Sequence, residues 1–190
     1  MPTYLRSWLP LAVAITGLCL AIYASGQQIY RQSLNDPQIQ LAEDAVARIS
    51  GGASASSTIP KTSVDIAGSL AAFMVVYDAT GTPLVSSGLL DGRVPVPPAG
   101  VFEYAANNSD DRLTLEPEVG VRIAAVVKAI PQGKGFVLVG RNMRVVEARI
   151  SDLGDLLLAA WIMLMIATFA TTVIAKKYLR DHNGYMRISL

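Results

Sequence analysis

Two long apolar segments without a charged residue constrain the fold of this chain more than any other feature. WLPLAVAITGLCLAIYAS occupies residues 8–25, and LLLAAWIMLMIATFATTVIA occupies residues 156–175. A helix needs roughly 20 apolar residues to cross the hydrocarbon core of a bilayer. Because a backbone in hydrocarbon must satisfy its own hydrogen bonds, we expect both segments to be transmembrane helices.

The first segment has a second interpretation, as a cleaved signal peptide. Arg6 precedes it, and the small residues of ASG at positions 24–26 would suit a cleavage site. The apolar run is long for the core of a signal peptide, so we favour an uncleaved anchor. Cys19, within this run, is the only cysteine of the chain, which excludes an intramolecular disulfide and a cysteine-based metal site.

The charges beside the second segment predict the orientation in the membrane. Lys176, Lys177 and Arg180 follow it, which favours a cytoplasmic carboxyl terminus. With two spans, both termini are then expected in the cytoplasm. The expected segments are a cytoplasmic amino terminus (1–7), a first span (8–25), an extracytoplasmic domain (26–150), a stalk end and second span (151–175) and a short basic cytoplasmic tail (176–190).

The domain between the spans is expected to begin with an amphipathic helix. Its apolar residues recur at spacings of three and four: Ile39, Ala42, Val46 and Ile49. Pro37 suits the first turn of that helix, and Asn35 or Asp36 suits its cap. Gly51 and Gly52 are expected to end it. The stretch GGASASSTIP that follows is read as a flexible loop.

Short segments rich in β-branched and aromatic residues then predict an antiparallel sheet. FMVVY and LVSS flank the turn DATGTP, and VFEYA is read as a short strand before a polar turn, NNSDD. RLTLE and VRIAAVVK form a hairpin about residues 116–120, and FVLVGR follows the turn PQGKG as a last strand. No proline interrupts the next segment, so we expect one helix from about Asn142 to Lys176. The predicted fold class is α+β: a sheet of about five strands with an N-terminal helix, between two transmembrane helices.

This order of elements, with its VVYDATGTPLVSSG hairpin, resembles the extracytoplasmic PAS-like (Cache-type) sensor domains of bacterial histidine kinases and chemoreceptors. The resemblance covers roughly residues 27–150. It implies a domain that binds a small molecule between sheet and helices, or couples to a partner, in the bacterial cytoplasmic (inner) membrane. Family members continue into a signalling module, whereas fifteen residues follow the second span here. We therefore expect any signal to leave through contacts with other membrane proteins.

Four polar side chains on the predicted strands are candidate ligand-binding residues. Tyr77 and Asp78 close the first strand, and Arg122 and Lys128 share a face of a later strand with small apolar residues. An arginine on such a face can bind a carboxylate with two hydrogen bonds. The alternative is that this face is simply the solvated side of an antiparallel sheet.

Composition and motifs argue against several classes of function. A net charge of +1 gives no global basic character, so no nucleic-acid partner is expected. The only histidine, His182, lies in the predicted cytoplasmic tail, which excludes a histidine triad or histidine metal site outside the membrane. GKGFVLVG, residues 133–140, lacks the ending of a phosphate-binding loop. We expect no catalysis, no catalytic residue, no metal and no cofactor.

Small residues four apart suggest where the spans can pack closely against other helices. They are Gly17 with Ala21 in the first span, and Ala167 with Thr171 in the second. The first hypothesis is a sensory or partner-binding protein that works as a homodimer or with a larger membrane protein. The alternative is a structural or accessory scaffold of the cell envelope that binds no ligand.

Overall fold

The structure is a computed structural model that describes the backbone of residues 3–186. Side chains are described in this range except at residues 3, 31, 33–35 and 180–186. The predicted tail at 176–190 therefore lies partly outside the described residues, and so does the side chain of His182.

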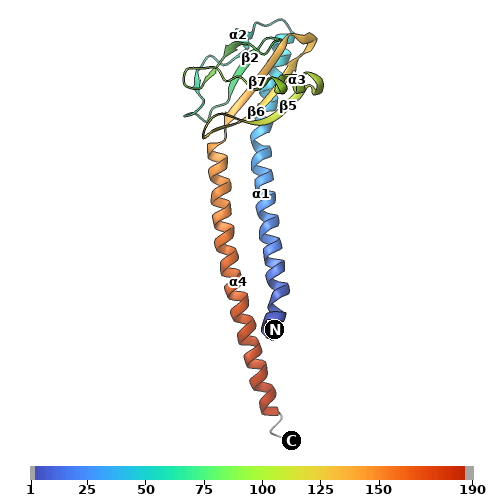
Figure 1. The fold of residues 1–190 in the computed structure, drawn as a ribbon, viewed down its shortest axis with the longest axis vertical. Helices are drawn as coiled ribbons and strands as arrows, with labels where there is room; N and C mark the ends of the chain where they lie inside the picture. The colour runs from blue at the N-terminus through green and yellow to red at the C-terminus, as the bar shows by residue number, and fades with distance from the viewer. Residues whose placement is uncertain (1–2, 187–190) are drawn as a thin grey trace. The chain divides into compact units, whose positions relative to one another are not determined.

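Two long helices precede and follow a set of shorter elements (Figure 1). In chain order the elements are α1 (Thr3–Ser50), α2 (Ala55–Thr58), β1 (Val64–Asp65), β2 (Phe73–Tyr77), β3 (Pro83–Ser86), β4 (Gly88–Leu89), α3 (Ala99–Asn108), β5 (Asp110–Glu118), β6 (Val121–Ile130), η1 (Pro131–Gly133), β7 (Gly135–Asn142) and α4 (Arg144–Met186). They form two compact units, each described by itself below: the sheet domain Ile29–Ala148, and a helix pair made of the remaining parts of α1 and α4.

Five antiparallel strands form the main sheet, in the order β3-β2-β7-β6-β5. This confirms the predicted α+β class with an antiparallel sheet of five strands. The β2–β3 turn contains Gly81 at φ 83°, and the β5–β6 turn contains Gly120 at φ 82°, which are the left-handed conformations that glycine allows. A short parallel pair, β1 with β4, lies in segments for which no strand was predicted.

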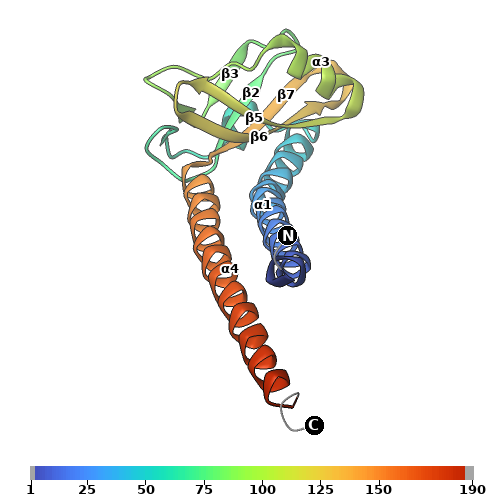
Figure 2. The same ribbon diagram turned by 60° about the horizontal axis from the view of Figure 1, so that its bottom comes forward.

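Both faces of the sheet carry apolar side chains that other elements cover. Successive residues of a strand point to opposite faces, and the central strands β2 and β7 are buried at nearly every position. On one face Val101, Phe102 and Ala105 of α3 pack on Ile123, Ala125 and Val127 of β6, with Phe73, Val75 and Tyr77 of β2. On the other face Ala42 and Ala45 of α1 pack on Val126, Val137 and Val139. Figure 2 shows α3 and the end of α1 on opposite sides of the sheet. The interpretation of the Arg122–Lys128 face as a solvated side is therefore wrong at its centre, where Ala124 and Val126 are buried.

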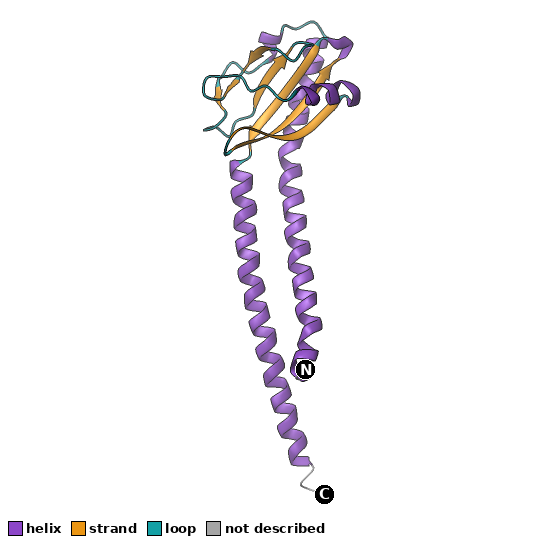
Figure 3. Ribbon diagram, in the orientation of Figure 1, coloured by secondary structure: helices purple, strands orange, loops and turns teal. Residues whose placement is uncertain are grey.

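Helix α1 corrects the predicted start of the domain's first helix. We expected a new helix at Pro37, but α1 is continuous from Thr3 to Ser50 (Figure 3). A proline removes one backbone hydrogen bond, and no glycine lies between Gly26 and Gly51 to favour a break. The predicted apolar face is confirmed, because Ala42 is fully buried and Ile39, Val46 and Ile49 pack around it. The predicted end is confirmed as well, since the N–H of Gly51 donates to the Ala47 carbonyl and Gly52 has φ 96°.

Three further predictions between the helices are wrong. VFEYA is part of helix α3 rather than a strand, because Val101, Phe102 and Ala105 lie on one helical face and reach the core together. The NNSDD turn is reduced to Ser109, at φ 72°, between α3 and β5. GGASASSTIP contains the short helix α2, which Ser54 caps by accepting from the N–H of Ser57.

Helix α4 confirms the unbroken helix expected from about Asn142, and it extends beyond Lys176 to Met186. Its start is fixed in the sheet domain, where Met143 and Val146 are buried. The side-chain oxygen of Asn142 accepts from the N–H of Arg144 at 2.8 Å and caps the first turn.

Two helices in the described part of the chain are long and apolar enough to cross a membrane. These are Tyr4–Tyr30, with a mean hydropathy of 1.8, and Arg144–Leu179, with 2.2. Only 6% and 0% of their most apolar windows are buried, which distinguishes them from the core helix of a soluble protein. The first, near the amino terminus, also fits a signal sequence.

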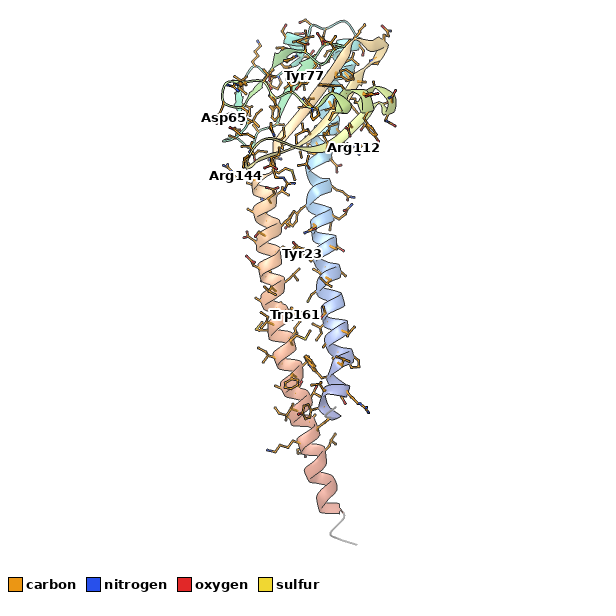
Figure 4. All side chains as sticks on the ribbon, in the orientation of Figure 1. Tyr23, Asp65, Tyr77, Arg112, Arg144 and Trp161 are labelled. Carbon is orange, nitrogen blue, oxygen red and sulfur yellow. The ribbon has the colours of Figure 1, made fainter. Side chains whose placement is uncertain are left out.

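The helix pair meets along a seam of half-buried residues spaced three and four apart. Trp8 donates to the Thr168 hydroxyl at 3.1 Å, and Trp161 donates to the Thr16 hydroxyl at 3.0 Å, so the two helices run antiparallel. Farther along the seam, a Cβ at Gly154 would lie 3.4 Å from the Tyr23 ring. Figure 4 shows Tyr23 and Trp161 between the two helices.

Candidate functional site

Strand β6 carries two cations on one face, and each is held by a glutamate of a long helix. The Arg122 guanidinium donates to the carboxylate of Glu147, in α4, at 2.6 Å. The Lys128 ammonium donates to the carboxylate of Glu43, in α1, at 2.8 Å. β6 lies between β5 and β7 in the sheet. Its two cations also bond it to the parts of α1 and α4 that belong to the sheet domain.

Tyr77 lies on the opposite face of the sheet from Lys128 and is fully buried. Its hydroxyl donates to the Pro95 carbonyl, and its ring packs at 5.0 Å from that of Phe102. Burial raises the pKa of Tyr77, because the phenolate would be poorly solvated there. Tyr77 is therefore a filled part of the core and not a wall of an open site.

Asp78 organises the β2–β3 turn. Its carboxylate accepts from the Thr80 hydroxyl at 2.7 Å and from the backbone N–H groups of Thr80 and Thr82 at 2.8 and 2.9 Å. The Thr80 hydroxyl bond is the largest cause, and the Thr82 backbone bond the next, of a lowered pKa for Asp78. These bonds favour its charged form, so the residue stabilises the turn.

A cavity of about 540 Å³ opens beside Lys128 at one end of the sheet domain. Its walls come from α1, the β2–β3 turn, α3, β6, η1 and β7. The lining residues are Val46, Ala79, Ala106, Ser109, Lys128, Ala129, Ile130, Pro131, Gln132, Gly133, Gly135 and Phe136. The wall is mainly apolar, and Lys128 is the ionisable side chain in it. The structure thus brings one of the four predicted ligand residues to a cavity.

Two non-glycine residues of the cavity wall have left-handed backbones, Ser109 at φ 72° and Gln132 at φ 66°. Such a conformation costs roughly 1–2 kcal/mol for an L-residue, so the surrounding structure must hold it. The third non-glycine residue of this kind in the described chain, Asp91, does not line the cavity. Strained backbone of this kind is concentrated at functional sites in proteins.

Sequence reasoning did not single out Glu43, Glu147, Ser109 or Gln132. The two glutamates lie in helices, far along the chain from the cations that they bind. The only local signal was the β6–β7 turn, PQGKG, which was correctly predicted as a turn but not as the wall of a site. No group of three or more metal-ligating side chains occurs among the described residues.

The four predicted membrane-packing residues lie outside the seam of the helix pair. Gly17, Ala21, Ala167 and Thr171 are all exposed on α1 or α4. Nothing lies within 4 Å of a Cβ built at Gly17, which borders an apolar groove of about 600 Å³ between the helices. Packing of these residues against another chain stays a prediction.

Comparisons with protein-family models, with curated proteins and with solved structures find no match for this chain. The resemblance to PAS-like (Cache-type) domains therefore stays a prediction that rests on the order of elements.

Proposed function

We propose that this chain is a non-catalytic, two-span membrane protein whose sheet domain binds a small ligand or a partner and passes the effect to its apolar helices. One observation carries the proposal: both apolar helices are continuous with core elements of the sheet domain, and one strand holds each of them with an ion pair. Ala42 and Ala45 of α1, and Met143 before α4, are buried in that domain. A shift of β6 would then act on both helices without a flexible linker to absorb it.

Exposed ion pairs are weak, about 0–1 kcal/mol each, so they do not explain stability. Weak contacts suit a switch, because a binding event of a few kcal/mol can change them. The side chain of Glu43 is 54% exposed and that of Glu147 is 36% exposed, so water can replace either glutamate as the partner of its cation.

Spin labels on the helix pair test the proposal. Labels at Leu18→Cys and Leu158→Cys, in a Cys19→Ser background, would report the separation of the two helices in nanodiscs. We expect the double variant Arg122→Met/Lys128→Met to shift or broaden the distance distribution. The control is Arg112→Met, since the Arg112–Asp110 ion pair joins two residues of β5 alone. Identical distributions in all variants would contradict the proposal.

The orientation in the membrane is part of the same proposal. We infer that the protein lies in the bacterial inner membrane with both termini in the cytoplasm and the sheet domain outside. Reporter fusions after Gly51 and after Leu190 are expected to read extracytoplasmic and cytoplasmic locations, respectively. A mature amino terminus near residue 27 would show that the first apolar segment is a cleaved signal. It would contradict the topology with two spans and both termini in the cytoplasm.

A scaffold without a ligand is the alternative function. Its support is the filled core around Tyr77, Phe102 and Phe136, in which the Tyr77 and Phe102 rings lie 5.0 Å apart and the Phe102 and Phe136 rings 4.9 Å apart. A scaffold predicts a partner that co-purifies with the wild type and helices that do not respond to the β6 variants. The spin-label measurement therefore separates the two functions.

A further inference from the structure

We infer that the cavity beside Lys128 binds a small organic monocarboxylate with an apolar body, whose carboxylate replaces Glu43 at the Lys128 ammonium. This inference rests on the proposed binding function of the sheet domain and names its ligand class. Glu43 belongs to α1, so the exchange would also release one contact between β6 and that helix.

The cavity has the size and lining that such a ligand needs. Its volume of about 540 Å³ lies in the range of small-molecule sites, roughly 300–1,000 Å³. Val46, Ala106, Ile130 and Phe136 supply apolar wall from four different elements. An apolar wall with one cation selects for a ligand that carries one negative group on an apolar body.

Lys128 is placed to receive a carboxylate. Its side chain is 22% exposed, whereas that of Glu43 is 54% exposed. Release of Glu43 therefore returns a mainly solvated carboxylate to water, but it would leave the more buried ammonium without an acceptor. A ligand carboxylate satisfies the ammonium again, so exchange of one acceptor for the other has a low free-energy cost. Ser109 and Gln132 add polar groups to the same wall.

The cavity also contacts the helix that would respond. Val46 lines it and lies one turn after Glu43 in α1, so a bound ligand would touch this helix while it removes the Glu43 contact. Binding and release would thus act on the same part of α1.

Fluorine NMR on the full chain in nanodiscs tests the inference, with 4-fluorobenzoate as the probe and uncharged 4-fluorobenzamide as its matched control. We expect saturable broadening of the benzoate signal, beyond that in empty nanodiscs, and much weaker broadening of the amide signal. Lys128→Met should weaken benzoate binding by roughly tenfold or more, as loss of a charged hydrogen bond predicts. Glu43→Gln should strengthen it, because a competing carboxylate is removed.

Lys134→Met is the matched control, because Lys134 is exposed in the same turn but does not line the cavity. We expect it to change benzoate binding by no more than about twofold, the effect of a screened surface charge. Circular dichroism of each variant would verify that it folds. The absence of saturable binding, equal binding of benzoate and benzamide, or unchanged binding in Lys128→Met would each overturn the inference. If one of these results were found but the Arg122→Met/Lys128→Met variant still shifted the spin-label distances, the proposed function would hold and only the monocarboxylate ligand would be ruled out.

Discussion

The carboxylate of Asp78 accepts three hydrogen bonds from Thr80 and Thr82, and their contribution to stability depends on the charge of that carboxylate. Its pKa is lowered in the folded state, so the folded state binds a proton there less readily than the unfolded state does. Its contribution to stability is therefore present above the ordinary carboxyl pKa of about 4, and it is lost as the pH falls through the lowered value.

Asp78→Asn retains an acceptor oxygen but cannot titrate. We expect the wild type to be more stable than the variant at neutral pH, and the difference to shrink as the pH falls below about 4. Urea unfolding of the sheet domain, followed by circular dichroism at several pH values, measures this difference. A difference that is constant from neutral to acid pH would argue against the role given to Asp78.

Gly135 begins β7 with φ 126°, and a Cβ there would overlap the Tyr77 carbonyl oxygen. The neighbouring Gly133 has φ 66° and nothing within 4 Å of such a Cβ. We expect Gly135→Ala to lower the free energy of unfolding by about 3 kcal/mol or more, because the backbone must move. Gly133→Ala should cost only about 1 kcal/mol, the strain of a left-handed L-residue. Urea unfolding of both variants measures these losses. Similar losses in free energy of unfolding would contradict the claim that the Tyr77 carbonyl requires glycine at position 135.

The junction between β7 and α4 is the element that joins the sheet to the second apolar helix. Asn142, at the end of β7, donates to the Ile66 carbonyl at 2.8 Å and caps α4 through the N–H of Arg144. Arg141 donates to the Leu70 carbonyl at 2.7 Å. The loop after β1 is therefore bonded to the residues at which α4 begins.

Asn142→Ala removes the cap and the amide bonds to the Ile66 and Ala67 carbonyls, and it leaves the buried Ile66 carbonyl without this donor. We expect it to destabilise the sheet domain by roughly 2–3 kcal/mol. The matched control is Asn108→Ala, whose amide bonds the Tyr104 carbonyl at an exposed site. Its cost should stay below about 1 kcal/mol. Hydrogen exchange should also show loss of protection at Arg144 in Asn142→Ala alone, and equal protection in the two variants would count against the cap.

The whole molecule divides between a unit with its own two-sided core and a pair of apolar helices. A fragment of residues 29–148 contains the sheet, α3, and the part of α1 that covers the other face. We expect this fragment to fold by itself in water and to show a mixed circular-dichroism spectrum and one cooperative melt. A fragment of residues 55–148, which lacks the covering part of α1, is the comparison and should melt at a lower temperature. A disordered or wholly helical spectrum for the longer fragment would refute the division.

Local patterns in the sequence determined much of this architecture. The uncharged runs, the alternation along β5 and β6, the apolar run of β7, and the glycines after α1 and in the hairpins each act within a few residues, so a single sequence reveals them. Segments with mixed signals were read less well. VFEYA has the composition of a strand, and only its packing on Ile123 and Val127 decides that it is a helix.

The candidate site depended on the tertiary structure. Lys128 and Glu43 are 85 residues apart, and Arg122 and Glu147 are 25 apart, so no local pattern connects them. The sequence by itself determined that Tyr77 and Lys128 lie on strands, but strand pairing placed them on opposite faces of the sheet and brought only Lys128 to a cavity. The physical reason is that a cavity is what several distant elements leave unfilled when they pack, which the spacing of residues along one element cannot encode.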